Sequence, residues 1–218
     1  MSLREPDMTS FDPDALEPRQ QYKLMSGTII PRPIALVTTL GPDGVANAAP
    51  FSLFNMVGVD PPMLMFSLTP RTGEVKDTGR NIEHLPEFVV HIVDEGVKEK
   101  MNICSADFPP GTSEIDFAGL RTAPSVKVRP PRLVECPAQF ECRLIDIIKV
   151  GRRPNHLVIG EVVMMHYREG IVDPAKFYVD AARLAPIGRL EGAGMYTRVT
   201  DRFQMGRPEI PGVPATSG

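Results

Sequence analysis

The sequence has little cysteine, no strong excess of charge and no long hydrophobic run. Its three cysteines are an odd number without a C-x-x-C pair, so they provide neither a disulfide framework nor a zinc knuckle, and they fit a reducing compartment. The 24 Lys and Arg residues against 27 Asp and Glu give a net charge of −3 at pH 7. This balance produces no field that would recruit nucleic acid or an anionic membrane.

Hydrophobic runs in this chain are too short to cross a bilayer. One of the longest, at 157–165, is interrupted by Gly160 and Glu161, whereas a membrane helix needs about 20 apolar residues. Residues 1–20 are acidic and contain proline, and they lack the apolar segment after a basic stretch that marks a secretory signal. We therefore expect a cytoplasmic protein.

The length and composition suit one folded domain. The chain has 218 residues and a mass of 24.0 kDa, with 42% hydrophobic and 23% charged residues. We divide it into an N-terminal extension (1–20), one domain (21–203) and a flexible C-terminal tail (204–218). The tail contains three prolines and few apolar residues, so we expect it to be flexible or to lie on a neighbouring subunit.

Strand patterns dominate the domain. The apolar segments 33–40 and 45–51 flank GPDG at 41–44, in which proline presets the turn and glycine closes it. This arrangement predicts a β-hairpin. We expect further strands at 62–68, 87–93, 138–150 and 156–167. Their lengths and β-branched residues favour a curved antiparallel sheet that closes into a barrel.

Two helices interrupt the strands without the βαβ rhythm of a parallel sheet. One is predicted at about 74–84, with Thr72 as its N-cap, and the other at about 95–106. The irregular stretch at 107–131 is too long for a plain connection and is either a lid or a packing arm.

Three single residues fit structural roles. Cys142 shares strand parity with apolar neighbours and is predicted to pack in the core, and Cys104 has no local base that would activate it. His91 alternates with valines inside a strand, which predicts a hydrogen-bonded histidine in the interior or at an interface.

Basic residues gather where the first helix begins. Arg71, Lys76 and Arg80 lie around this start, and the free N–H groups and dipole of a helix N-terminus attract phosphate. Thr78 falls on the inward face of the helix and can turn its hydroxyl toward a ligand, as can Asn81. The alternative is a solvated basic face with a hydrogen-bonded threonine.

The segment 47–55, NAAPFSLFN, places polar residues in an apolar stretch. Pro50 cannot donate to a ladder and is predicted to free the chain from its partner strand. Ser52 and Asn55 then follow, with Ser67 ending the next strand, so that side chains and backbone N–H groups can meet a polar ligand. The alternative is a bulge or barrel corner with capping side chains.

Five strings occur in one order along the chain: RPIALVTT, NAAPFS, DPPMLMFS, KDTGRNI and HLVIGEV. In this order they resemble the flavin reductase-like, FMN-binding split-barrel family, which includes flavoredoxin-like members, over about residues 20–200. The resemblance implies a mainly β fold: a six-stranded antiparallel split barrel (Greek-key) with a few flanking helices. It also implies a homodimer with FMN near the subunit interface.

The resemblance gives ten residues a cofactor-binding role. They are Asn47, Pro50, Phe51, Ser52, Ser67, Arg71, Lys76, Asp77, Thr78 and Asn81. His156, at the start of a predicted strand, would lie beside the nicotinamide or flavin ring and orient a carboxamide. The alternative for His156 is a strand-end histidine that bonds to backbone.

Two absences limit the other cofactors. No G-x-G-x-x-G follows a strand, so NAD(P)H would bind transiently over the flavin and not in a Rossmann domain. No histidine and carboxylate spacing suits a metal, and we predict none. In the glycine-rich run at 184–196, Arg189 and Tyr196 either reach a flavin or partner subunit, or belong to a loop over the barrel end.

Two functions follow from the resemblance. The first is an FMN-binding oxidoreductase that passes electrons from NAD(P)H through the flavin to free flavin, another small acceptor or a partner redox protein. The second is an FMN-binding electron carrier or sensor, similar to flavoredoxin, without its own NAD(P)H turnover. A barrel that binds a non-redox small molecule is a third possibility.

Overall fold

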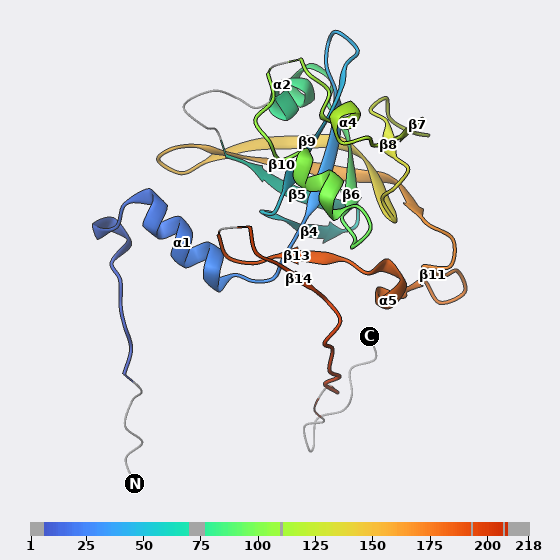
Figure 1. The fold of residues 1–218 in the computed structure, drawn as a ribbon. Helices are drawn as coiled ribbons and strands as arrows, with labels where there is room; N and C mark the ends of the chain where they lie inside the picture. The colour runs from blue at the N-terminus through green and yellow to red at the C-terminus, as the bar shows by residue number, and fades with distance from the viewer. Residues whose placement is uncertain (1–6, 70–76, 110, 193, 207, 209–218) are drawn as a thin grey trace.

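The computed structural model describes residues 7–69, 77–109, 111–192, 194–206 and 208 (Figure 1). Its centre is a seven-stranded sheet in which every strand pair is antiparallel. In sheet order the strands are β3 (Ala46–Phe51), β2 (Ala35–Leu40), β6 (Glu87–Ile92), β9 (Ala138–Val150), β10 (Asn155–Tyr167), β5 (Pro62–Leu68) and β4 (Phe54–Val59). The mainly β antiparallel prediction is confirmed, but the expected count of six strands is wrong by one.

The strand that the sequence did not reveal is β4. It is an edge strand whose ladder with β5 is irregular between Met56 and Gly58. Met56 and Val59 are exposed, and a Cβ at Gly58 would lie 2.3 Å from Met63 Cε, the flexible end of that side chain. An exposed edge with a bulge shows no regular alternation of apolar and polar residues.

The predicted strand at 33–40 is divided at Ile34. Its first part, β1 (Arg32–Pro33), pairs with β13 (Ile187–Arg189), which also pairs with β14 (Tyr196–Arg198). Its second part, β2, lies between β3 and β6 and forms the predicted hairpin with β3. Two further strand pairs are short: β7 (Thr122–Ala123) with β8 (Arg132–Leu133), and β11 (Val172–Asp173) with β12 (Tyr178–Val179).

Six short helical segments accompany the sheets in the described residues. They are η1 (Pro13–Ala15), α1 (Pro18–Thr28), α2 (Asp77–His84), α3 (Lys98–Ile103), α4 (Glu114–Phe117) and α5 (Ala181–Leu184). The helix predicted at 74–84 is present from Asp77 onward, whereas its expected cap, Thr72, lies outside the described residues. Within the described chain, no helix is both long and apolar enough to span a membrane.

The helix predicted at 95–106 is shorter than expected. Asp94 accepts hydrogen bonds from the N–H groups of Gly96 (3.1 Å) and Val97 (3.0 Å) and holds a turn there, so α3 begins only at Lys98. Such side-chain bonds offer the backbone an alternative to helix.

The two faces of the central sheet carry separate apolar clusters. One cluster contains three phenylalanines in contact: Phe51 lies 4.9 Å from Phe66, and Phe66 lies 5.5 Å from Phe88 in an edge-to-face arrangement. The other contains Leu36 and Met101 and is covered by α3 and α4. Because β2 is covered on both faces, its first five residues are all buried, including Thr38 and Thr39.

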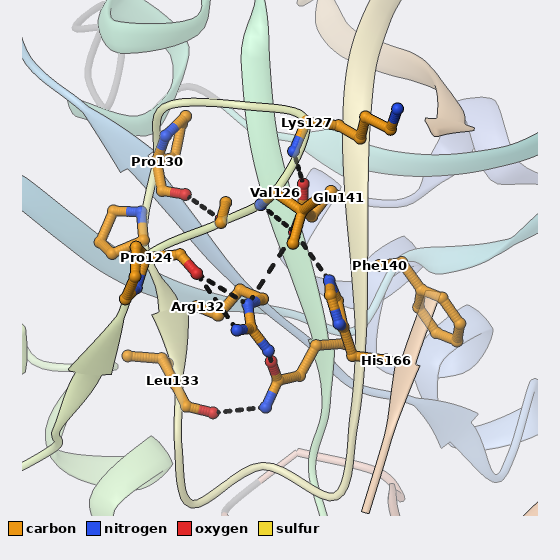
Figure 2. Close-up of polar contacts among 12 residues, drawn as sticks. Pro124, Val126, Lys127, Pro130, Arg132, Leu133, Phe140, Glu141 and His166 are labelled. Atoms are coloured by element: carbon orange, nitrogen blue, oxygen red, sulfur yellow. Dashed lines mark hydrogen bonds and ion pairs between the residues drawn. The ribbon is translucent and has the colours of Figure 1, made fainter. Parts of the chain in front are cut away.

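The stretch at 107–131 packs onto the sheet, so of the two alternatives the packing arm is correct. Ile115 and Leu120 are buried in the second cluster. Farther along, Val126 and Lys127 donate their N–H groups to the carboxylate of Glu141 (2.8 and 2.6 Å), which His166 also contacts at 2.7 Å (Figure 2). Glu141 lies on β9 and is fully buried, so it fastens the arm to the sheet.

Candidate functional site

Four buried side chains form a continuous hydrogen-bonded relay at the hairpin end of the sheet. Asn81 of α2 donates Nδ2 to Thr39 Oγ1 of β2 at 3.0 Å, and the Thr39 hydroxyl donates to Asn47 Oδ1 of β3 at 2.5 Å. Asn47 Nδ2 then donates to Glu114 Oε1 of α4 at 3.4 Å. The relay therefore connects α2 to α4 across two strands.

A small cavity of about 180 Å³ opens beside this relay. It lies between the hairpin turn, α2 and the arm, and its lining contains Gly41, Pro42, Asp43, Val45, Asn47, Asp77, Arg80, Asn81, Gly111 and Thr112. Three predicted flavin-binding residues meet here: Asn47, Asp77 and Asn81. Arg80 forms a close ion pair with Asp77.

Thr78 follows at the start of α2 and faces inward, as helical periodicity predicted. Its side chain is 1% exposed, and its hydroxyl has no hydrogen-bond partner among the described residues. A buried hydroxyl without a partner costs free energy. The alternative, in which the Thr78 hydroxyl is hydrogen-bonded within the protein, is therefore not observed. A ligand at the start of α2 could supply the missing hydrogen-bond partner.

Pro50 does not release the chain from its partner, so that prediction is wrong. Pro50 pairs with Leu36 inside β3, an edge strand that ends only at Phe51. On the outer side of β3, Ala48 N–H donates to Glu114 Oε2 at 3.1 Å and Ala46 C=O accepts from the Ser113 hydroxyl. Pro50 has the same strand parity as Ala46 and Ala48, so its backbone nitrogen also faces the open edge. Because proline has no N–H, this position leaves no unpaired donor there.

A second group of predicted residues lies where β3, β4 and β5 meet. Ser67 donates its N–H to Leu53 C=O at 2.9 Å, which brings the end of β5 against the turn that contains Ser52. Phe51 is buried just before that turn. Phe51 and Asn47 share one face of β3, four residues apart, so the two groups are about 13 Å from each other along one strand.

His156 belongs to this second group through β10. It stands opposite Leu68, and the next residue of β10 stands opposite Ser67. Its side chain is buried, and its ring nitrogens have no hydrogen-bond partner in the described chain. The alternative of a histidine bonded to backbone is therefore not observed.

Arg71 and Lys76 lie outside the described residues. The basic character predicted for the helix start is represented here only by Arg80. The sequence analysis did not assign Thr39, Gly41 or Glu114 to the site, nor the lining residues Pro42, Asp43, Val45, Gly111 and Thr112. A threonine facing inward from an apolar strand was a usable indication for Thr39, but nothing near Glu114 in the sequence marks it as a partner of Asn47.

A larger cavity of about 640 Å³ lies elsewhere, between α3 and β14. Met101, Ile187 and Tyr196 contribute apolar surface to it, and the Arg189 guanidinium lies 4.5 Å from the Tyr196 ring centre. None of the ten residues given a cofactor-binding role is among its described lining residues, but Tyr196, for which contact with a flavin was one alternative, is. We place the candidate site at the smaller cavity because polar side chains converge there.

Two buried groups are excluded from chemistry by their surroundings. His91 donates Nδ1–H to Leu36 C=O (2.8 Å) and accepts from Leu133 N–H at Nε2 (2.9 Å), so the ring is neutral, and burial lowers its pKa to about 4. Burial raises the pKa of the Cys104 thiol to about 12. The interior role of His91 is confirmed, as is the core position of Cys142. No metal-binding group of three His, Cys, Asp or Glu side chains occurs in the described part of the chain.

Comparison with known proteins gives a consistent result. The model of a family described as "Flavin reductase like domain" matches residues 25–184. Nitrilotriacetate monooxygenase component B from Bacillus cereus is 38% identical, with a TM-score of 0.88, covering 92% of this chain and all of that one. The 2-nitrobenzoate 2-nitroreductase NbaA of Pseudomonas fluorescens is 37% identical, with a TM-score of 0.84, covering 96% of this chain and all of that one.

The fold class is supported by a more distant structure. A protein of Shewanella frigidimarina with a split barrel domain is 18% identical over 92% of this chain and all of that one, with a TM-score of 0.80. The split-barrel architecture predicted from the sequence is therefore confirmed.

Proposed function

The chain belongs to the flavin reductase-like family, and on this premise we propose that it is an FMN-binding oxidoreductase. It takes electrons from NAD(P)H and passes them to free flavin, another small acceptor or a partner redox protein. The similar monooxygenase component and nitroreductase support redox chemistry by their names. We also propose that the protein works in the cytoplasm.

The unpartnered hydroxyl of Thr78 carries the proposal. Thr78 lies at the first turn of α2, where free backbone N–H groups favour an anion, and one turn later Asn81 lines the cavity. Polar groups left unsatisfied by the protein fit a ligand with many hydrogen-bonding groups. We propose that Asp77, Thr78, Asn81 and Asn47 hold the flavin side chain, with Arg71 and Lys76 at the phosphate.

The second group of residues would hold the ring. Phe51 supplies apolar surface, Pro50 and Ser52 border the turn, and Ser67 places a small polar side chain beside it. When bound, the flavin supplies hydride acceptance and electron transfer, which need no protein base. The residues of this chain position the ring and exclude water from it.

His156 is proposed to orient the nicotinamide. Its ring nitrogens lack a hydrogen-bond partner among the described residues, so a donor and an acceptor are available for a carboxamide. His156→Ala should raise the KM for NAD(P)H by a larger factor than the factor by which it lowers the rate of electron transfer from chemically reduced flavin to the acceptor.

A homodimer is proposed as the working form. Tyr22 and Met25 of α1 are 57% and 60% exposed and lie three residues apart, on one side of the helix, and Ile29, which caps the end of α1, is 56% exposed. In Figure 1, α1 lies beside the body of the molecule. Exposed apolar stripes of this kind are typical of protein interfaces.

One titration tests the function. Purified protein is loaded with FMN, and absorbance and fluorescence quenching report binding; the loaded protein is then titrated with NADH or NADPH without oxygen. Rapid bleaching by either nicotinamide is expected. Absence of any flavin binding would refute the proposal, and reduction only by dithionite or a partner protein would favour the electron carrier instead.

A further inference from the structure

We propose that the small cavity beside α2 binds hydroxyl groups of the flavin's ribityl chain and not its phosphate, and that Glu114 fixes this choice. The inference rests on the proposed flavin binding and adds a chemical identity to one part of the site. It follows from the direction of the hydrogen bonds in the relay, not from the residue types alone.

Glu114 determines the orientation of Asn47. A carboxylate offers only acceptors, and Glu114 Oε2 already accepts from Ala48 N–H at 3.1 Å. The Asn47 group that faces Oε1 at 3.4 Å must therefore be its NH2, because an amide oxygen there would repel the carboxylate. Asn47 is thus forced to turn its Oδ1 toward Thr39.

This orientation is passed on to Asn81. The Thr39 hydroxyl has one hydrogen and gives it to Asn47 Oδ1, so it can only accept from Asn81. Asn81 must turn its NH2 to Thr39 and its Oδ1 the other way. No described residue donates to that oxygen, which lies 3.4 Å from the position that a Cβ on Gly41 would occupy. The relay therefore presents an acceptor at the cavity.

The charges around the cavity agree with this polarity. Among the described lining residues, Asp43 and Asp77 carry negative charges and Arg80 carries a positive charge, which gives these residues a net charge of −1. Arg80 is also engaged with Asp77. A dianionic phosphate would meet carboxylates and an amide oxygen here, whereas a hydroxyl can donate to each of them.

The size of the cavity agrees as well. Its volume of about 180 Å³ is below the range of pockets that enclose a whole ligand, about 300 to 1,000 Å³, and suits part of a ligand. A short polyol segment is such a part. The phosphate would then bind at the start of α2, where Thr78 has its unpartnered hydroxyl.

The first test inverts the relay. In Glu114→Gln, the new amide must keep its oxygen on Ala48 N–H, so its NH2 turns to Asn47, and the reversed chain presents the NH2 of Asn81 to the cavity. We expect the Kd of riboflavin and of FMN to rise by the same factor, about tenfold. The Kd of lumiflavin, which has no ribityl chain, should not change.

The second test adds charge without removing the acceptor. Asn81→Asp keeps an oxygen toward the cavity and makes it anionic. If hydroxyls bind there, the ratio of the FMN and riboflavin affinities should stay within about twofold of that of the unmodified protein. If the phosphate binds there, FMN should weaken at least tenfold more than riboflavin, and the inference would be overturned.

Glu87→Gln is the matched control, because Glu87 also accepts a backbone N–H, that of Arg129, at 2.8 Å but lies outside the cavity. It should leave all three affinities unchanged. If Glu114→Gln leaves the affinity for flavins unchanged, or changes the affinity for FMN alone, this inference is refuted. The proposed function would remain intact. If Glu114→Gln does not fold, the affinity ratio in Asn81→Asp still decides.

Discussion

Thr78 and Thr38 are two buried threonines that differ in one respect. The Thr38 hydroxyl donates to Pro131 C=O at 2.6 Å, whereas the Thr78 hydroxyl has no partner within the described residues. In Thr78→Val the protein loses only an unsatisfied group, so we expect unfolding of the flavin-free protein at equal or higher denaturant concentration. Flavin affinity should nevertheless fall about fivefold to tenfold.

Thr38→Val is the control for that prediction. It removes a hydrogen bond that is made, so it should lower the free energy of unfolding by about 1 kcal/mol and leave flavin affinity unchanged. Chemical denaturation and flavin titration of both variants measure the two effects. If Thr78→Val lowered the free energy of unfolding as much as Thr38→Val does, the Thr78 hydroxyl would have to be hydrogen-bonded within the protein.

His91 makes the stability depend on pH. Its pKa is about 4 in the folded chain against an ordinary value of 6.5, because the ring is buried and both nitrogens are engaged in the neutral form. The unfolded chain therefore binds the proton more readily. The stabilisation from neutral His91 is complete above pH 6.5 and declines as the pH falls toward 4, by about 3 kcal/mol in all.

Denaturant unfolding between pH 7.5 and 4.5 tests this. His91→Gln should be less stable at pH 7.5 but should show a flatter decline below pH 6.5, whereas His84→Gln at an exposed position should behave as the unmodified protein does. A decline of the same slope in His91→Gln would show that other groups cause it.

Local patterns predicted the single residues that depend on local geometry. Helical periodicity placed Thr78 inward, and strand alternation placed His91 and Cys142 in the interior. The relay was not predictable in this way, because Asn47 and Glu114 are 67 positions apart and Thr39 and Asn81 are 42 apart. Which carboxylate meets which amide depends on how the arm crosses the edge of the sheet.

At the scale of elements, the buried carboxylate of Glu141 holds the last part of the arm, residues 124–131. Burial alone would raise the pKa of Glu141, but the N–H groups of Val126 and Lys127 and the contact with His166 lower it below its ordinary value (Figure 2). The ionised form is thus favoured by folding. Its stabilisation is present above the ordinary glutamate pKa and is lost as the pH falls through the lowered value.

Glu141→Gln should loosen the arm first. An amide can accept only one of the two N–H groups well and adds hydrogens that face them, so we expect amide exchange at Val126 and Lys127 to accelerate at least tenfold. Exchange in β2 should change much less, and flavin affinity should stay the same, since the arm at this point is not part of the candidate site. Unchanged exchange at both amides would mean that Glu141 does not hold the arm.

Strands and helices could be predicted from the sequence where at least one of their faces packs against the rest of the chain. The strands at 62–68 and 138–150 were predicted with the bounds of β5 and β9, because buried faces impose regular patterns. The edge strand β4 and the helix α1 were missed. Both expose large apolar side chains, so their apolar residues do not mark a face that packs in the core of this chain.

At the scale of the whole molecule, α1 is attached mainly at its end. The Arg32 guanidinium bonds to the carbonyl groups of Ser26, Ile29 and Leu190, which ties the last turn of α1 to the glycine-rich loop. The stripe of Tyr22, Met25 and Ile29 remains exposed. We infer that the partner subunit of the proposed homodimer covers it.

Sedimentation tests the dimer together with the shared site. The unmodified protein is expected at twice 24.0 kDa, and the double substitution Tyr22→Glu with Met25→Glu should shift it to 24.0 kDa at micromolar concentration, because two carboxylates would be buried at the interface. Lys23→Glu changes the net charge by the same two units on the same helix, outside the stripe, and should remain dimeric. If the flavin lies near the interface, its affinity should fall with dissociation and not with Lys23→Glu. Full flavin occupancy in a 24.0 kDa species would instead place the whole site within one subunit.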